Sequence, residues 1–243
     1  MSAIFNELFF RPVLNLLIFI YNSIPGSDLG IAIILLTIII KLVLYPLSKQ
    51  ALKSQKALQD LQPKMNALKE RYKNEKEKLA QEMMKLYKEQ KVNPLSSCLP
   101  LLIQLPFLFA VFRVFSNGLS GEVGGHLYSF IANPGVLNTS FLGLINLSSP
   151  SPILGVLAGA SQFAQTRMLG IKRPEVKSKE SKDEDVMALV NKQMMYMMPA
   201  ITVFLGFSFP AGLMLYWFVT TILTILQQRL LFKKGEGVAG ATF

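Results

Sequence analysis

The sequence predicts an all-α polytopic membrane protein with a five-helix transmembrane core and a cytosolic antiparallel helical hairpin. Of its 243 residues, 51% are hydrophobic and only 16% are charged, which is little charge for a soluble domain of this length. Of its 25 Lys and Arg residues, 22 gather in three blocks, Lys49–Lys91, Arg167–Lys192 and Arg229–Lys234, which long apolar runs separate. By the positive-inside rule these blocks are expected in the cytosol.

Residues 1–28 are predicted to form an N-terminal interfacial amphipathic helix. Its apolar residues recur with helical spacing, and its polar residues fall on the opposite side. The apolar set is Phe5, Leu8, Phe9, Pro12, Val13, Leu16 and Ile20, and the polar set is Glu7, Arg11, Asn15 and Asn22. A true span is the alternative, because Leu14–Tyr21 is apolar almost all round. The segment has no basic region followed by a small-residue cleavage site, so we do not expect a signal peptide.

Five later stretches have the character of membrane spans. They are Leu29–Leu47, Leu99–Phe115, Ile153–Leu169, Met194–Phe209 and Ala211–Phe232. The first, transmembrane helix 1 at 29–47, is followed by the hairpin at 48–94. Residues 95–232 hold helices 2–5, with an outer loop at 116–152 and a cytosolic loop at 170–193, and residues 233–243 form a short cytosolic tail. An odd number of spans with a cytosolic C-terminus places the N-terminus outside. The outer loop contains no Lys or Arg, in agreement with this topology.

The first basic block has its own helical periodicity. Apolar residues three and four apart are followed, after a polar interval, by a second such run, which is typical of two helices packed along a narrow seam. The two runs are Leu58, Leu61, Met65, Leu68 and Tyr72, then Leu79, Met83 and Leu86. Pro63 is expected to kink or delay the first helix.

Lys41 is a charged residue inside the first predicted span. A charge near the centre of a membrane helix costs ~2.5–3.5 kcal/mol on insertion scales, so such a residue usually faces protein or water. The alternative is snorkelling, in which the ammonium group bends toward the cytosol. Thr37 and Tyr45 lie one turn before and one turn after Lys41, and they complete a polar line on one helix face.

Two other spans carry polar stripes that favour the groove interpretation. The third span has Ser161, Gln162, Gln165 and Thr166; the last has Tyr216, Thr220 and Thr224 at intervals of four, beside Trp217 and Thr221. Converging on Lys41, these stripes would line a hydrated cavity in the cytosolic half. The alternative is hydrogen bonding between helices, which is common in membrane bundles. That alternative leaves Lys41 without a partner, because no Asp or Glu follows Asp28 in any span.

The sequence offers no support for covalent catalysis. Cys98 is the only cysteine, so neither a disulfide framework nor a thiolate metal cluster is expected. The single histidine, His126, lies in a Gly-rich connection and is interpreted as an ordinary loop residue. No phosphate-binding loop, metal site or nucleophile–base pair stands out, so we expect no enzyme activity and no cofactor. Gly155 and Gly159 form a GxxxG pattern whose simplest meaning is close helix packing.

Two groups of motifs resemble the YidC-type membrane insertases, the YidC/Oxa/Alb family. The first runs from Gln62-Pro63-Lys64-Met65 to Leu95 and continues with the Cys98–Pro106 stretch. The second comprises Met195-Tyr196-Met197-Met198-Pro199 and the run Phe209–Trp217. The resemblance extends from about Asn6 to Lys233. It implies five core spans, a cytosolic hairpin, and a hydrophilic groove that is open to cytosol and lipid and closed on the outer side.

The resemblance also implies a function and its residues. Lys41 takes the place of a groove cation that is usually Arg in the family, and Thr37, Gln165 and Trp217 match groove or client-contact positions. The implied role is an insertase and chaperone for nascent membrane proteins in the cell (inner or plasma) membrane, without nucleotide hydrolysis. The implied partners are nascent membrane proteins, the ribosome, the Sec translocon, signal recognition components and membrane lipids, with the insertase itself a monomer. A small polytopic transporter and a ribosome-docking scaffold are the alternative functions.

Overall fold

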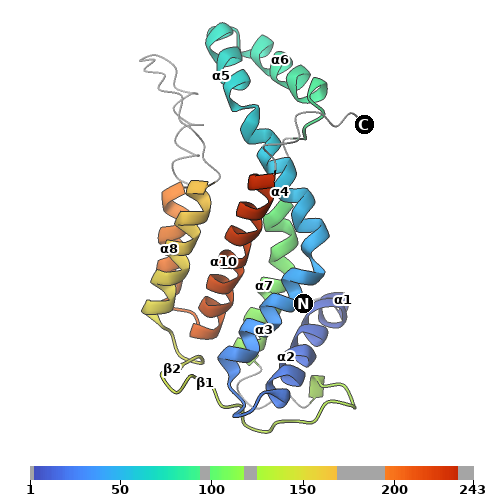
Figure 1. The fold of residues 1–243 in the computed structure, drawn as a ribbon, viewed down its shortest axis with the longest axis vertical. Coiled ribbons are helices and arrows are strands. Elements are labelled where there is room, and N and C mark those ends of the chain that lie inside the picture. Colours follow the sequence, from blue (N-terminus) through green and yellow to red (C-terminus); the bar gives the residue numbers. More distant parts are fainter. Residues whose placement is uncertain (1–2, 94–98, 118–124, 169–194, 235–243) are drawn as a thin grey trace.

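The computed structural model describes residues 3–93, 99–117, 125–168 and 195–234. The chain is mostly helical, and Figure 1 shows an elongated bundle with a helical hairpin at one end. A small two-stranded sheet lies at the other end. The helical class predicted from the sequence is therefore confirmed, with the sheet as an addition to it.

The N-terminal segment forms one helix of 21 residues, Ala3–Ser23, from α1 (Ala3–Phe5), the π-helical η1 (Asn6–Phe10) and α2 (Arg11–Ser23). It contacts the next helix of the chain, α3 (Leu29–Val43), and also α7 (Leu99–Asn117). The helix places a set of large apolar side chains in the core. This set is Phe10, Val13, Leu14, Leu17, Ile18, Ile20 and Tyr21.

The polar side of this helix holds the connection that follows α7. Asn15 is 2% exposed; its Nδ2 donates to the carbonyl oxygen of His126 (3.0 Å) and its Oδ1 accepts from the backbone N–H of Tyr128 (2.7 Å). Further along, Asn22 Nδ2 donates to the carbonyl oxygen of Ala132 (2.8 Å). The amphipathic pattern thus has a second cause besides the membrane interface, since two of its polar residues bind protein backbone. The interfacial position of the helix stays a prediction.

The segment predicted as one span, Leu29–Leu47, is divided in the structure. Helix α3 ends at Val43, and α4 (Tyr45–Asp60) begins after Leu44. Pro46 explains the break, because proline has no N–H to donate to the carbonyl group four residues earlier and its ring crowds that carbonyl. The axis bends by 69° between the helices before and after Leu44. The apolar run at 29–47 does not reveal this bend, because apolar residues continue through it.

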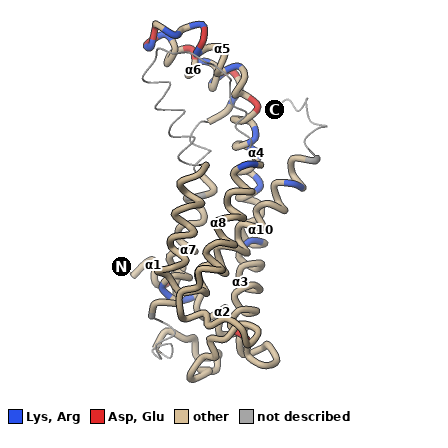
Figure 2. The backbone as a smooth tube through the Cα atoms, turned by 90° about the vertical axis from the view of Figure 1, so that its left-hand side faces the viewer, with Lys and Arg blue, Asp and Glu red and all other residues tan. Residues whose placement is uncertain are grey.

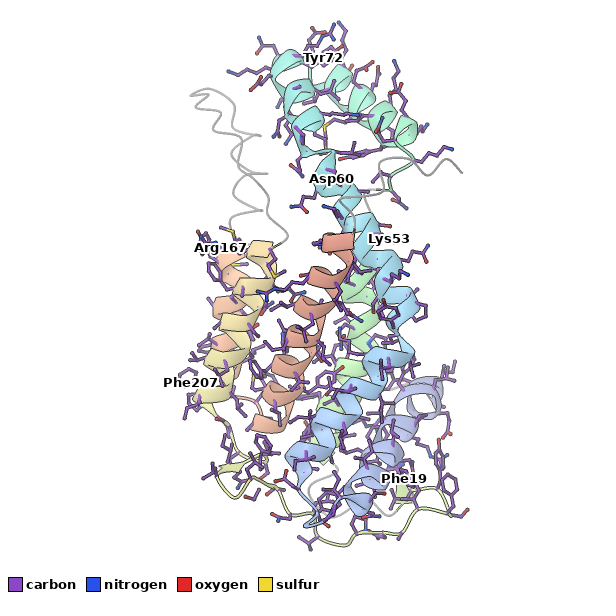
Figure 3. All side chains as sticks on the ribbon, viewed as in Figure 1. Phe19, Lys53, Asp60, Tyr72, Arg167 and Phe207 are labelled. Atoms are coloured by element: carbon purple, nitrogen blue, oxygen red, sulfur yellow. The ribbon has the colours of Figure 1, made fainter. Side chains whose placement is uncertain are left out.

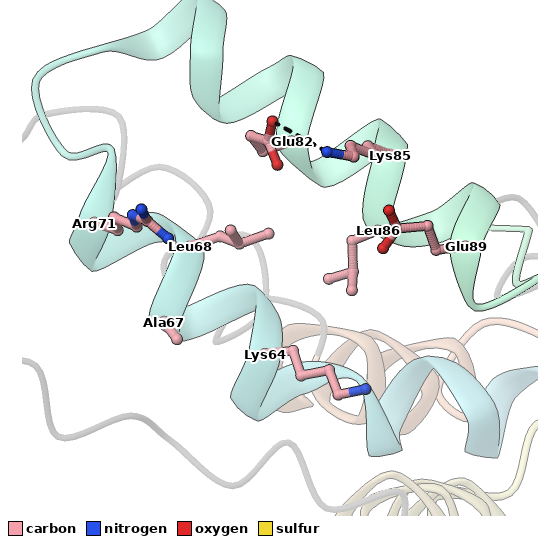
Figure 4. A pocket seen from close by; sticks show the side chains of 8 residues that line it. All are labelled: Lys64, Ala67, Leu68, Arg71, Glu82, Lys85, Leu86 and Glu89. Carbon is pink, nitrogen blue, oxygen red and sulfur yellow. Dashed lines mark ion pairs between the residues drawn. The ribbon is translucent and has the colours of Figure 1, made fainter.

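Helices α5 (Gln62–Arg71) and α6 (Lys76–Glu89) form the hairpin. A helix boundary at Leu61, two residues before Pro63, agrees with the interruption predicted there. The two helices contact each other, and the Tyr87 hydroxyl lies 3.6 Å from the Met65 sulfur. Figure 4 shows the cleft between them, with a volume of about 310 Å³, into which Leu68 and Leu86 point from opposite sides.

The remaining helices complete the bundle. They are α7, α8 (Pro152–Met168), the helix Met195–Leu205 and α10 (Ala211–Lys234). Helix α10 contacts α8, α3, α7 and α4, so it lies at the centre of the bundle. The strands β1 (Ser140–Phe141) and β2 (Ile145–Asn146) pair antiparallel. Their turn has positive φ at Leu142 and Gly143, a short-range feature that no apolar period reveals.

Length and composition identify the helices that could cross a membrane. Ala3–Ser23 and Ala211–Phe232 each satisfy both requirements, and the bent pair Leu29–Val43 with Tyr45–Arg71 does so if it counts as one span. Leu102–Ser116 and Met195–Leu205 are apolar but shorter. The number of spans predicted from the sequence, five, stays a prediction.

Candidate functional site

Helix α10 carries a polar line through the apolar bundle. At 3.6 residues per turn, side chains four apart share one face, and Tyr216, Thr220, Thr224 and Gln228 have this spacing. We call these four residues the α10 polar face. The first three belong to the predicted stripe. Gln228 continues the same interval and was missed, although the spacing alone could have revealed it.

Lys41 of α3 reaches the α10 polar face. Its Nζ donates a hydrogen bond of 2.9 Å to Thr224 Oγ1, and that hydroxyl in turn donates to the carbonyl oxygen of Thr220 (2.7 Å). The prediction that hydrogen bonding between helices would leave Lys41 without a partner is therefore wrong. The partner is neutral, however, and no ion pair between Lys41 and a carboxylate occurs among the described residues. The positive charge is thus solvated by a hydroxyl dipole but not neutralised.

Tyr216 connects the α10 polar face to α7. Its side chain is 1% exposed, and its hydroxyl accepts a hydrogen bond from Gln104 Nε2. Buried tyrosine hydroxyls usually find such a partner. Gln104 was not singled out from the sequence. An amide inside the otherwise apolar Leu101–Phe112 run was the available signal, because polar side chains in such helices tend to bond across to a neighbour.

Two of the predicted groove hydroxyls are satisfied by their own helices. Thr37 is buried, and its Oγ1 donates to the carbonyl oxygen of Ile33 (2.6 Å). Ser161 Oγ donates to the carbonyl oxygen of Ala158 (2.8 Å) in α8. Such back-bonding is common for hydroxyl residues in helices. Neither hydroxyl is bonded to Lys41 or to the α10 polar face, so these residues do not extend that face.

The other polar residues of α8 divide between packing and open surface. Gln162 Oε1 accepts a hydrogen bond from Thr202 Oγ1, which joins α8 to the Met195–Leu205 helix. Gln165 is partly exposed, as is Trp217 beside the α10 polar face. The structure therefore brings Lys41 together with the α10 stripe and gives Gln162 a separate, interhelical partner.

The charged residues are concentrated at one end of the molecule. Figure 2 shows most Lys and Arg on the hairpin, on α4 and near the end of α10. In Figure 3, Lys53, Tyr72 and Arg167 lie toward that end, and Phe19 and Phe207 lie toward the other. Among the described residues, no group of His, Cys, Asp and Glu could hold a metal ion. The site is accordingly a polar face with a single cation, and it offers hydrogen bonds and charge to a ligand.

The match to a family model covers most of the chain. The model of the 60Kd inner membrane protein matches residues 19–237, which include every residue of the α10 polar face and Lys41. The chain belongs to this family. The chain is also similar to several curated proteins that are named membrane protein insertase YidC.

These relatives differ in length. The chain is 35% identical over 237 residues to the YidC of Fusobacterium nucleatum, covering 97% of this chain and 100% of the relative. It is 35% identical to that of Haemophilus influenzae over 226 residues, 92% of this chain but 36% of the relative. The Geobacter sulfurreducens YidC gives 33% over 220 residues, with 90% and 36% covered. The chain thus spans about a third of the length of the longer relatives. Its membership of the family, together with its apolar helices, makes it an inner membrane protein.

Proposed function

We propose that this chain inserts nascent membrane proteins into the inner or plasma membrane. The observation that carries the proposal is the Lys41–Thr224 hydrogen bond, which holds a cation against a polar helix face inside an apolar bundle. The names of its relatives support the same role. The proposed core consists of five transmembrane helices, and the α5–α6 hairpin lies in the cytosol, as the charge distribution favours.

The proposed mechanism needs no covalent step and no nucleotide. A short hydrophilic segment of the client enters a groove along the α10 polar face. There Lys41, Thr220 and Thr224 replace part of its hydration, which shortens the low-dielectric path that the segment must cross. The apolar helix of the client then moves into lipid, driven by its own hydrophobic transfer. An acidic client segment gains further from the charge of Lys41.

Gln165 and Trp217 are proposed client contacts, because both are partly exposed next to the buried polar residues. Thr37 and Ser161 are proposed to present hydroxyls near the groove from helices α3 and α8, and Gln162 is proposed to fix α8 against the Met195–Leu205 helix through Thr202. The proposed partners at the charged end are the ribosome, the Sec translocon and signal recognition components. We propose that the protein works as a monomer, with its N-terminus outside and its C-terminus in the cytosol.

Reconstitution tests this function directly. Purified protein in lipid vesicles should insert a short membrane client in the absence of any nucleotide, with the client protected from added protease. A photoreactive residue in place of Gln165 should form an adduct with the client during insertion. The same residue in place of Val136, which is almost fully exposed in the predicted outer segment, is the matched control and should form none. Equal insertion by protein-free vesicles, or adducts only at position 136, would contradict the proposal.

A further inference from the structure

Gln228 is buried without a hydrogen-bond partner. The residue is 0% exposed, and neither its Nε2 nor its Oε1 finds a partner in the described part of the chain. The buried Oε1 of the adjacent Gln227 is equally unbonded there. Buried polar groups in proteins are normally hydrogen-bonded, and leaving one unpaired costs its full desolvation. The fully buried Gln228 amide is therefore the least well satisfied polar group of this face, and the packing around it is under strain.

The place of Gln228 follows from its neighbours on the same face of α10. One turn before it, Thr224 is bonded to Lys41 of α3. One turn after it, the Phe232 ring lies 5.2 Å from the Nζ of Lys56 in α4. Gln228 thus lies between a contact with α3 and a contact with α4, and Figure 1 shows the end of α10 beside α4. It faces the region where α3 passes into α4.

Helix α4 is attached to that region in a way that permits it to swing. It is separated from α3 by Leu44, which is outside the regular helix, and the chain bends by 69° there. Helix α4 contacts α10 and α7, but only Ala51 and Leu52 of its side chains are fully buried there. The far end of α4 carries the α5–α6 hairpin, which makes α4 the arm through which the hairpin moves.

We propose that α4 is a hinged cover over a polypeptide-binding site at the Gln228 amide. The cover turns about Leu44 and exposes this amide, which then binds the backbone of a client segment. A primary amide suits this ligand because it donates and accepts at once, as a peptide group does. The unpaired amide weakens the covered state, so little binding free energy is needed to open it. The inference rests on the proposed insertase function.

The first test replaces Gln228 with an apolar side chain of similar length. Gln228→Met removes the two unpaired polar atoms, so the melting temperature of the purified protein should rise. Insertion should fall about tenfold, equivalent to about 1.4 kcal/mol, because the cover then opens less readily and the site has lost its amide. Gln81→Met, the same change at an exposed position of α6, should alter neither quantity. A lower melting temperature, or unchanged insertion, for Gln228→Met would overturn the proposal.

The second test locks the cover. In a Cys98→Ser background, Lys56→Cys and Phe232→Cys are joined by a bifunctional reagent that contains a cleavable disulfide. Insertion should stop on locking and return on reduction, and each single-cysteine protein treated alike should stay active. Insertion by the locked protein would refute the hinge.

A photoreactive residue at position 227 identifies the occupant of the site. It should capture the client only in the unlocked protein. If locking stops insertion but position 227 never captures the client, water alone occupies the site and the polypeptide-binding proposal is wrong. If the unmodified protein inserts no client at all, the proposed insertase function is wrong. The melting temperature of Gln228→Met still tests, independently of insertion, whether the covered state is strained.

Discussion

At the scale of single residues, Lys41 owes its importance to what it lacks. Its hydroxyl partner, Thr224, stabilises the ammonium group without cancelling its charge. An ion pair with a carboxylate would have neutralised the ammonium charge and left little electrostatic attraction for a ligand. Two unit charges 4 Å apart, at an effective dielectric of 20, interact by ~4 kcal/mol. An acidic client segment could gain a substantial part of that energy on approaching Lys41.

We therefore predict that the charge of Lys41, and not its shape, supports the insertion of clients with acidic translocated segments. Lys41→Arg should keep activity, Lys41→Gln should lose about tenfold or more, since ~1.4 kcal/mol suffices for that, and Lys41→Glu should be worse because it repels the client. The measurement is insertion of matched acidic and neutral clients into vesicles that hold equal amounts of each variant. Neutral clients serve as the control and should change little. Equal insertion of both clients by Lys41→Gln and the unaltered protein would mean that Lys41 merely snorkels.

At the scale of elements, α8 approaches the Met195–Leu205 helix and the turn after it at glycines. A Cβ atom built on Gly155 of α8 would lie 2.7 Å from the Cα of Gly206, and one built on Gly206 would lie 2.5 Å from the Cα of Gly155. Gly159 is similarly close to Val203 and to the carbonyl oxygen of Pro199. The close packing predicted from the GxxxG pattern is thereby confirmed. Backbone lies on both sides of the Gly155–Gly206 contact, so no flexible side chain can move aside.

Gly206→Ala is accordingly predicted to separate α8 from the Met195–Leu205 helix. Overpacking of this kind typically costs about 1–3 kcal/mol, so the melting temperature in detergent should fall and protease should cut the chain more readily. Gly125→Ala makes the same change where nothing lies within 4 Å of the added Cβ, and it should leave the protein unaltered. Equal melting temperatures for the two variants would show that close packing at Gly206 does not stabilise the bundle.

The sequence predicted those features that depend on helical periodicity, or on a residue such as proline or glycine with a strong local effect on the backbone. The interruption before Pro63, the glycine contact and the Tyr216–Thr224 stripe all fall in this class. It failed where the result depends on a distant partner. Nothing in the spacing of Asn15 indicates that its amide binds the backbone at His126 and Tyr128, 111 and 113 residues away. Likewise, Lys41 and Thr224 meet only because α3 packs on α10.

At the scale of the whole molecule, charge separates the two ends of the bundle. The hairpin end is rich in Lys and Arg (Figure 2), whereas the connection between α7 and α8 contains neither Lys nor Arg. Basic residues are retained on the cytosolic side during insertion. This asymmetry is a property of the complete fold, because it combines α4, α5, α6 and the end of α10 on one side.

We predict from this asymmetry that the hairpin end is cytosolic. In a Cys98→Ser background, Ser129→Cys in the connection after α7 should react with an impermeant maleimide applied to right-side-out membrane vesicles. Lys53→Cys in α4 should react only after the vesicles are permeabilised. Both positions are exposed in the structure, so a difference in labelling reports the side of the membrane. Labelling of Lys53→Cys in sealed vesicles would contradict the predicted topology.

The hydrogen bonds that hold the N-terminal helix can form only late in the synthesis of the chain. Tyr21 accepts its hydrogen bond from the backbone N–H of Asn138, which is made 117 residues later. At translation rates of about 5–20 residues per second, the tyrosine waits roughly 6–23 s for that partner, and Asn15 waits nearly as long for His126. During this interval the ribosome still holds the chain, while the Asn15 amide must be solvated by water, headgroups or another protein. Under the proposed insertase function, a newly made copy is itself a client for copies already in the membrane.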